Sequence, residues 1–209
     1  MDGYAAWLAH FLGAVGIAEP ALLIGHSFGG GVATAFAHAH PTSVRYLVLL
    51  NAVGGGSETG APTPGVAARD RPLRDWAWHF AREFFPPTRG LRMLATMSED
   101  LLPNLVRNPR AMWEVGNLAR HADLRTELEG IRELGMPVLV SWGDRDGVIS
   151  LASFEAVCRA VGCEGRVVAG NHSWLLTDPD AFGEIMANVL EVAGAGPSVS
   201  EQSPRPGFK

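Results

Sequence analysis

Residues 21–32 read ALLIGHSFGGGV, the most informative stretch of the chain. Residues 21–24 form a short apolar run without polar alternation, which is typical of a strand buried on both faces. Residues 25–29 match the pattern G-x-S-x-G, and the alanine-rich segment 32–40 is predicted to be a helix. We interpret residues 25–31 as a sharp turn that lifts the Ser27 hydroxyl above the sheet. Glycine is expected at both ends of the motif, because a Cβ there would collide with neighbouring backbone.

Further apolar segments extend this pattern into an alternation of strands and helices. The run from Val44 to Leu50 reads as a second fully apolar strand, so the order strand, helix, strand predicts a right-handed crossover in a parallel sheet. Two more strands are predicted at residues 137–142 and 166–168. The other predicted helices of the sheet region are residues 4–15, 124–134, 154–161 and 180–192.

Polar residues with complementary chemistry follow three of these strands. A serine hydroxyl is a weak nucleophile unless a histidine takes its proton, and that histidine needs a carboxylate to orient it. Asp144 and Asp146 follow the third strand, and His172 follows the fourth. Because the C-terminal ends of parallel strands share one edge of a sheet, we expect Ser27, one of the two carboxylates and His172 to meet there.

These motifs resemble those of the α/β-hydrolase superfamily, over roughly residues 4–192. Gly-His-Ser-Phe-Gly-Gly is similar to the nucleophile elbow of that family. Gly143-Asp144-Arg145-Asp146 resembles its G-x-x-D acid loop, and Gly170-Asn171-His172 resembles its histidine loop. The segment 178–182, Asp-Pro-Asp-Ala-Phe, resembles the D-P-x-x-F stretch that commonly opens the last helix.

The resemblance implies a role for each site residue. Ser27 would be the nucleophile and His172 the base, and the N–H of Phe28 would be one oxyanion donor. Asp146 would be the acid, while Asp144 would be a solvated turn residue. Some members carry the acid after the preceding strand, where this chain has Asn51, which cannot carry charge. His26 is interpreted as structural, and no cofactor or metal is implied.

The same resemblance implies a domain organisation. The expected fold class is α/β, a mostly parallel sheet with helices on both faces, formed by residues 1–56 and 131–194. Residues 57–130 would be a helical cap, and 195–209 a disordered tail. The rings of the cap segment could form its own core or line an apolar acyl pocket; they are Trp76, Trp78, Phe80, Phe84 and Phe85.

One feature of the family pattern is missing. Members usually begin with several more strands and a His-Gly loop that supplies the second oxyanion amide, and this chain contains no His-Gly dipeptide. An N-terminally truncated fold is therefore expected, with the edge at residues 21–25 open to strand pairing and oligomer formation. Losing one oxyanion donor would slow the reaction by about 10²–10³-fold.

Composition excludes several other classes. The 209 residues carry 17 basic and 22 acidic side chains, a net charge of −5, with no basic run, so a nucleic-acid partner is not expected. No apolar run reaches the roughly 20 residues of a membrane span, and a basic leader is missing, which predicts a cytoplasmic protein. Cys158 and Cys163 are the two cysteines, interpreted as small reduced thiols without a metal.

The sequence therefore predicts a serine hydrolase acting on a small apolar ester, thioester or lactone. Two alternatives stay open. The chain could be a weak or catalytically silent truncated fragment or binding module. It could also be a cofactor-free haloperoxidase or a carbon–carbon bond hydrolase that uses the same three residues.

Overall fold

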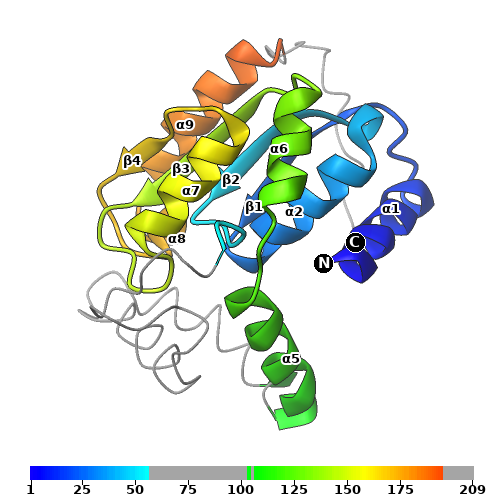
Figure 1. The fold of residues 1–209 in the computed structure, drawn as a ribbon, viewed down its shortest axis with the longest axis vertical. Coiled ribbons are helices and arrows are strands. Elements are labelled where there is room, and N and C mark those ends of the chain that lie inside the picture. Colours follow the sequence, from blue (N-terminus) through cyan, green and yellow to red (C-terminus); the bar gives the residue numbers. More distant parts are fainter. Residues whose placement is uncertain (57–102, 105, 195–209) are drawn as a thin grey trace, which may run out of the picture.

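The computed structural model describes residues 1–56, 103–104 and 106–194, and its centre is a parallel sheet (Figure 1). All pairings between neighbouring strands are parallel, and the strand order equals the chain order. The predicted parallel sheet is thus confirmed. Its strands are β1 (Ala21–His26), β2 (Val44–Leu50), β3 (Val138–Gly143) and β4 (Arg166–Val168).

Helices alternate with these strands along the chain. A short 3-10 turn, η1, at Pro41–Ser43 leads into β2. The α-helices of the described residues are α1 (Asp2–Ala14), α2 (Phe28–Ala39), α5 (Pro109–Arg120), α6 (Arg125–Glu133), α7 (Leu151–Val161), α8 (Trp174–Thr177) and α9 (Pro179–Val192).

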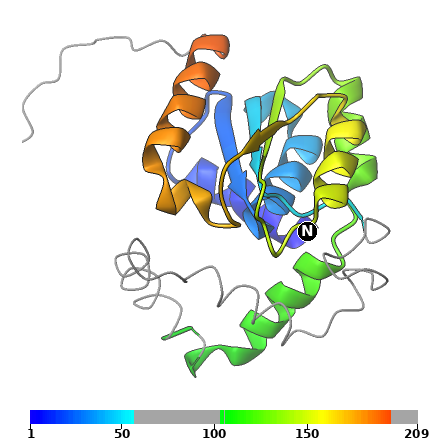
Figure 2. The same cartoon turned by 90° about the vertical axis from the view of Figure 1, so that its left-hand side faces the viewer.

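Two helical layers cover the two faces of the sheet, as Figure 2 shows. The helices α1, α2, α6 and α7 pack on one face, and α8 and α9 cover the other. The apolar side chains between the sheet and α1, α2, α6 and α7 form a first core, and those between the sheet and α8 and α9 form a second core. In β2, Leu47 and Leu49 contribute to the first core, and Val48 and Leu50 contribute to the second. All four residues are 0% exposed. Side chains alternate between the faces of a strand, so a central strand with two buried faces must be apolar at every position.

The start of α2 differs from the prediction. We expected a turn through residue 31 and a helix from Val32, but the helix begins at Phe28. Consecutive glycines are poor helix formers by themselves, which is why they suggested a turn. Here they lie where the helix packs close to the chain that follows β2: a Cβ at Gly31 would lie 2.7 Å from a methyl group of Val53.

The cap prediction falls largely on residues outside the described part of the chain. Residues 57–102 and the aromatic residues among them are not described, nor is the predicted tail. Among the described residues of the predicted cap, helix α5 projects away from the sheet at the end where α8 lies (Figure 1). In contrast, α6 buries Leu128 and Ile131 in the first core. The division into core and cap stays a prediction.

Within the described sheet, β1 is an edge strand. Ile24 of this strand is 41% exposed. On the neighbouring helix α1, Leu8 and Leu12 pack against the first core, whereas Trp7 and Phe11 are 64% and 44% exposed. The apolar stripe predicted for this helix is therefore only partly covered. Association of this edge with another chain stays a prediction.

Candidate active site

Ser27 lies between the last residue of β1 and the first residue of α2. Its backbone has φ 53° and ψ −122°, a conformation that a residue with a Cβ adopts only under strain from its surroundings. The Ser27 carbonyl accepts hydrogen bonds from the N–H groups of Gly30 and Val53, at 3.0 and 3.2 Å. These bonds hold the turn in place, and the serine lies at the N-terminal end of α2 as predicted.

The glycines around Ser27 have unequal roles. A Cβ on Gly25 would lie 2.6 Å from the carbonyl oxygen of Gly29, so glycine is required there, as predicted. The prediction for Gly29 is wrong, because a Cβ at that position meets open space. The second crowded position is Gly30, whose Cβ would overlap the side chain of Ala52. The second glycine of the G-x-S-x-G motif is Gly29. The close contact between α2 and the segment after β2 is instead made by Gly30.

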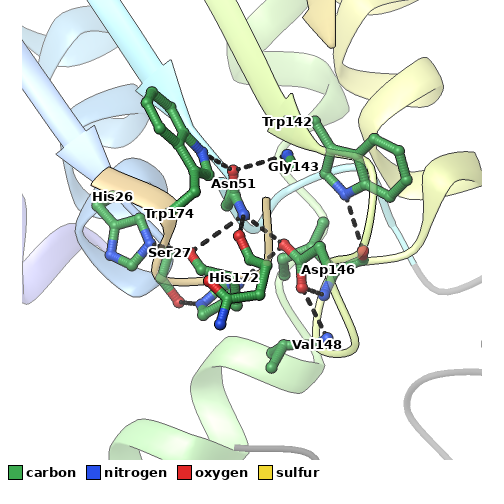
Figure 3. Close-up of polar contacts among 11 residues, drawn as sticks. His26, Ser27, Asn51, Trp142, Gly143, Asp146, Val148, His172 and Trp174 are labelled. Atoms are coloured by element: carbon green, nitrogen blue, oxygen red, sulfur yellow. Dashed lines mark hydrogen bonds and ion pairs between the residues drawn. The ribbon is translucent and has the colours of Figure 1, made fainter. Parts of the chain in front are cut away.

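His172 lies in the loop that follows β4, and its side chain is buried (Figure 3). Its Nε2 is 2.9 Å from Ser27 Oγ, and its Nδ1 is 2.8 Å from Asp146 Oδ2. A carboxylate oxygen accepts, so Nδ1–H donates to Asp146 and Nε2 is left to accept the proton of the serine hydroxyl. The structure thus brings Ser27, His172 and Asp146 into one hydrogen-bonded chain.

Asp146 is the carboxylate that reaches the histidine. Its Oδ1 accepts the N–H groups of Val148 and Ile149 at 2.7 and 2.8 Å, and its Oδ2 accepts from His172 and from the side chain of Asn51. Four donors therefore surround a carboxylate whose residue is 7% exposed. They compensate the cost of removing this group from water and fix its orientation.

Asp144 points elsewhere and has a different role. Its side chain is 49% exposed and lies 3.4 Å from the guanidinium of Arg145. Its Oδ1 also accepts the N–H of Gly170 at 2.9 Å. It is therefore exposed, as expected, yet it also joins the loop after β3 to the histidine loop.

Asn51 is the residue whose role the sequence did not reveal. It follows β2, is 1% exposed, and adopts φ 45°, a left-handed conformation that asparagine tolerates better than most residues. Its Nδ2 donates to Asp146 Oδ2 at 2.7 Å and to the carbonyl of His172 at 3.1 Å. Its Oδ1 accepts the N–H of Gly143 at 3.3 Å and the indole N–H of Trp174 at 3.0 Å. One neutral amide thus connects the loops after β2, β3 and β4 (Figure 3).

The signal for Asn51 was present but ambiguous. A polar residue directly after a fully apolar strand, at the edge where the other site residues were expected, is a candidate for the site. The sequence indicated only that it cannot serve as the acid. Its partners lie 92 to 123 residues away along the chain, so no local pattern identifies them.

His26, the residue before the serine, holds the same histidine loop. Its Nε2 lies 2.8 Å from the carbonyl oxygen of His172 and must donate, because a carbonyl only accepts. Burial, with a further contribution from the neighbouring His172 ring, lowers the pKa of His26 from its usual 6.5 to about 4. The imidazole is neutral near neutral pH, and its contacts agree with the structural role predicted for it.

Phe28 is the first residue of α2. The first N–H groups of a helix have no acceptor within the helix, and they carry the positive end of its dipole. The ring of Phe28 packs edge-on against Tyr4 of α1, with ring centroids 5.1 Å apart. This contact joins α1 to the start of α2.

The described residues contain neither a metal-binding cluster nor a membrane-spanning helix. Among them, no group of three or more His, Cys, Asp and Glu side chains is arranged to bind a metal ion. Within the same residues, no helix combines the length and apolar character needed to cross a bilayer.

Comparison with known proteins shows which family shares these features. A sequence profile described as the alpha/beta hydrolase family matches residues 1–185. The chain is 30% identical over 203 residues to 2-hydroxymuconate semialdehyde hydrolase of Pseudomonas putida, covering 91% of this chain and 70% of that protein. It is 32% identical over 163 residues to the dihydrolipoyllysine-residue acetyltransferase component of the acetoin cleaving system of Cupriavidus necator. That match covers 73% of this chain and 41% of the relative, less than half its length.

A solved structure agrees with the fold. The crystal structure of a hydrolase from Pseudomonas aeruginosa PA01 superposes with a TM-score of 0.59 at 22% identity, covering 88% of this chain and 70% of that chain. The profile match spans most of the chain, and the strand order and the sharp turn at Ser27 are consistent with it. The chain therefore belongs to the alpha/beta hydrolase family of enzymes.

Proposed function

We propose that this protein is a serine hydrolase that cleaves a small apolar ester, thioester or lactone through an acyl-enzyme on Ser27. The observation that carries the proposal is the chain of two hydrogen bonds from Ser27 Oγ to His172 Nε2 (2.9 Å) and from His172 Nδ1 to Asp146 Oδ2 (2.8 Å). The strained backbone of Ser27 and the burial of the other two side chains add support.

The proposed reaction divides into two proton-balanced steps. Ser27 Oγ attacks the acyl carbon while His172 Nε2 takes the hydroxyl proton, and His172 then returns that proton to the leaving alcohol or thiol. In the second step His172 takes a proton from water, the resulting hydroxide attacks the acyl-enzyme, and the protonated histidine returns its proton to Ser27 as the acid leaves. Asp146 holds the imidazole in the required tautomer and stabilises its protonated form.

The N–H of Phe28 is the proposed oxyanion donor. It follows Ser27 directly and belongs to the first turn of α2, where the helix dipole favours the negative charge that develops on the carbonyl oxygen. A donor at that position would stabilise both tetrahedral intermediates.

Hydrolysis of a carbon–carbon bond on the same residues is the second candidate. The observation in its favour is the similarity to a Pseudomonas putida protein whose name gives a semialdehyde, not an ester, as its substrate. A chain-length series of nitrophenyl esters, assayed beside an enol ketone, distinguishes the two. Turnover of the esters with a preference for one chain length supports the first proposal, whereas turnover of the ketone alone supports the second.

A fluorophosphonate probe tests the nucleophile directly. We expect the probe to label Ser27, and Ser27→Ala to abolish labelling and lower kcat by about 10⁴–10⁶-fold. Ser43→Ala, at the opposite end of β2, is the matched control and should label like the parent protein. Labelling of another serine, together with retained activity in Ser27→Ala, would contradict the assignment.

A further inference from the structure

The two cysteines of the chain meet at the C-terminal end of α7. The helix is followed by Gly162, which adopts φ 73° and ψ 35°. The N–H groups of Gly162 and Cys163 both donate to the carbonyl of Cys158, at 2.9 and 3.0 Å. A glycine-terminated helix end of this kind brings a residue of the last helical turn, here four before the glycine, against the residue directly after the glycine. This contact is usually between two apolar side chains. In this chain both positions hold thiols.

The surroundings of the two thiols differ. The two thiol groups are close enough to influence each other's ionisation, and the backbone N–H groups of Gly165 and Val140 lie near the sulfur of Cys163. Cys158 is 6% exposed, and Gly165 lies so close that a Cβ there would be 2.5 Å from its sulfur. Nearby donors stabilise the thiolate at Cys163, whereas Cys158 is shielded by apolar neighbours.

The ionisation of the pair follows this asymmetry. The interaction with the Cys158 thiol, aided by the backbone N–H groups, lowers the pKa of Cys163 from 9.0 to about 7. The same interaction and burial raise the pKa of Cys158. A thiolate is the reactive form of cysteine toward oxidants, so Cys163 is the residue that would react first.

Cys163 is partly exposed, whereas Cys158 is buried. They line an open pocket of about 460 Å³ together with Phe154, Arg159 and Glu164. The volume is large for a peroxide molecule and leaves room for a bulkier thiol reagent. The pocket lies beside the connection from α7 to β4, and none of its lining residues belongs to the proposed active site.

We propose that Cys163 and Cys158 form a peroxide-reactive dithiol that closes to a disulfide across the end of α7. The thiolate of Cys163 attacks hydrogen peroxide, giving a sulfenic acid and hydroxide. The sulfur of Cys158 then attacks the sulfenic sulfur, its proton and the sulfenic hydroxyl leave as water, and the disulfide forms. In sum, two thiols and one peroxide yield one disulfide and two waters. This inference does not rest on the proposed hydrolase function.

The experiment uses the full reduced chain, treated with hydrogen peroxide, then denatured, alkylated and weighed by intact-mass spectrometry. We expect a loss of about 2 Da, no alkylation of either cysteine, and full reversal by dithiothreitol. Cys158→Ser should stop at a sulfenic acid on Cys163 that dimedone traps. Cys163→Ser is the matched control and should react with peroxide at least about tenfold more slowly, because the remaining thiol is shielded and protonated.

Several outcomes would overturn the proposal. These are an intermolecular disulfide, oxidation of Cys163 to the sulfinic acid while Cys158 stays reduced, or equal peroxide reactivity of the two variants. A measurement on the parent protein does not depend on the variants folding: the rate of alkylation at Cys163, read by peptide mapping, should be half-maximal near pH 7. A half-maximal rate near pH 9 would show an ordinary thiol and contradict the proposal.

Discussion

At the scale of single residues, the Asn51 amide connects the candidate acid, Asp146, and the candidate base, His172. It donates to Asp146 and to the carbonyl of His172, and it accepts from Gly143 and Trp174. His26 donates to the same His172 carbonyl. The candidate base is therefore held at its backbone by two side chains and at its ring by Asp146, which leaves Nε2 aligned with Ser27.

Replacing Asn51 should weaken both stability and catalysis. Asn51→Ala leaves the N–H groups of Gly143 and Trp174 without this acceptor, which should lower the free energy of unfolding by about 2–4 kcal/mol. Because the His172 loop loses one anchor, kcat should fall by about 10–100-fold while KM stays within about threefold. Urea unfolding and ester hydrolysis measure the two effects. Full activity in Asn51→Ala would show that this amide does not position the histidine.

The two neighbouring aspartates should respond very differently to amide substitution. Asp146→Asn removes the acceptor that fixes the His172 tautomer, and kcat should fall by about 10⁴-fold. Asp144→Asn keeps an oxygen that accepts the Gly170 N–H, so its kcat should change by less than about tenfold. Steady-state kinetics on one nitrophenyl ester compares the pair. A larger loss in Asp144→Asn would mean that the acid has been assigned to the wrong carboxylate.

At the scale of elements, the junction of β1 and α2 depends on how closely the helix packs on the end of β2. Gly30→Ala places a methyl group on Ala52 and should lower the free energy of unfolding by about 1–3 kcal/mol and reduce labelling of Ser27. Gly29→Ala has open space and favours helix by up to about 1 kcal/mol, so it should fold at least as well as the parent. Thermal unfolding and fluorophosphonate labelling test the pair. Equal losses in both variants would contradict this account of the turn.

This junction also shows how far local patterns reach. The apolar run 21–24 and the G-x-S-x-G motif were enough to predict a strand followed by a sharp turn. The helix start at Phe28 was missed because three glycines in sequence have low helix propensity. Tertiary packing against Ala52 and Val53 overrides that propensity. The four-residue helix α8 was likewise missed, because so short an element shows no periodicity.

At the scale of the whole molecule, the partly buried His26, next to Ser27, couples stability to pH. The His26 pKa is 6.5 when unfolded and about 4 in the folded protein. Between these values the unfolded chain binds more protons, so the contribution is fully present above pH 6.5 and is lost as the pH falls toward about 4. As the pH falls from 6.5 to about 4, the protonation of His26 should lower the free energy of unfolding by up to about 3 kcal/mol.

His26→Gln isolates this effect, since glutamine keeps an N–H donor for the His172 carbonyl but does not titrate. Urea unfolding of both proteins at several pH values should give a shallower pH dependence for the variant. Identical slopes between pH 6.5 and 4 would show that the pKa of His26 does not change on folding, which contradicts the shift to about 4.

The sequence by itself determined the parallel sheet, the two-faced burial of β2 and the placement of Ser27, an acidic loop and His172 at one edge of the sheet. These follow from local apolar runs and from the rule that parallel strands end at the same edge. The residues alone left Asp144 and Asp146 undecided, and they assigned Asn51 no role. Only the tertiary structure decided these points, because they depend on contacts between groups 26 to 123 positions apart. Such contacts arise from strand register and from how closely helices pack on the sheet, and no short pattern in the chain encodes either.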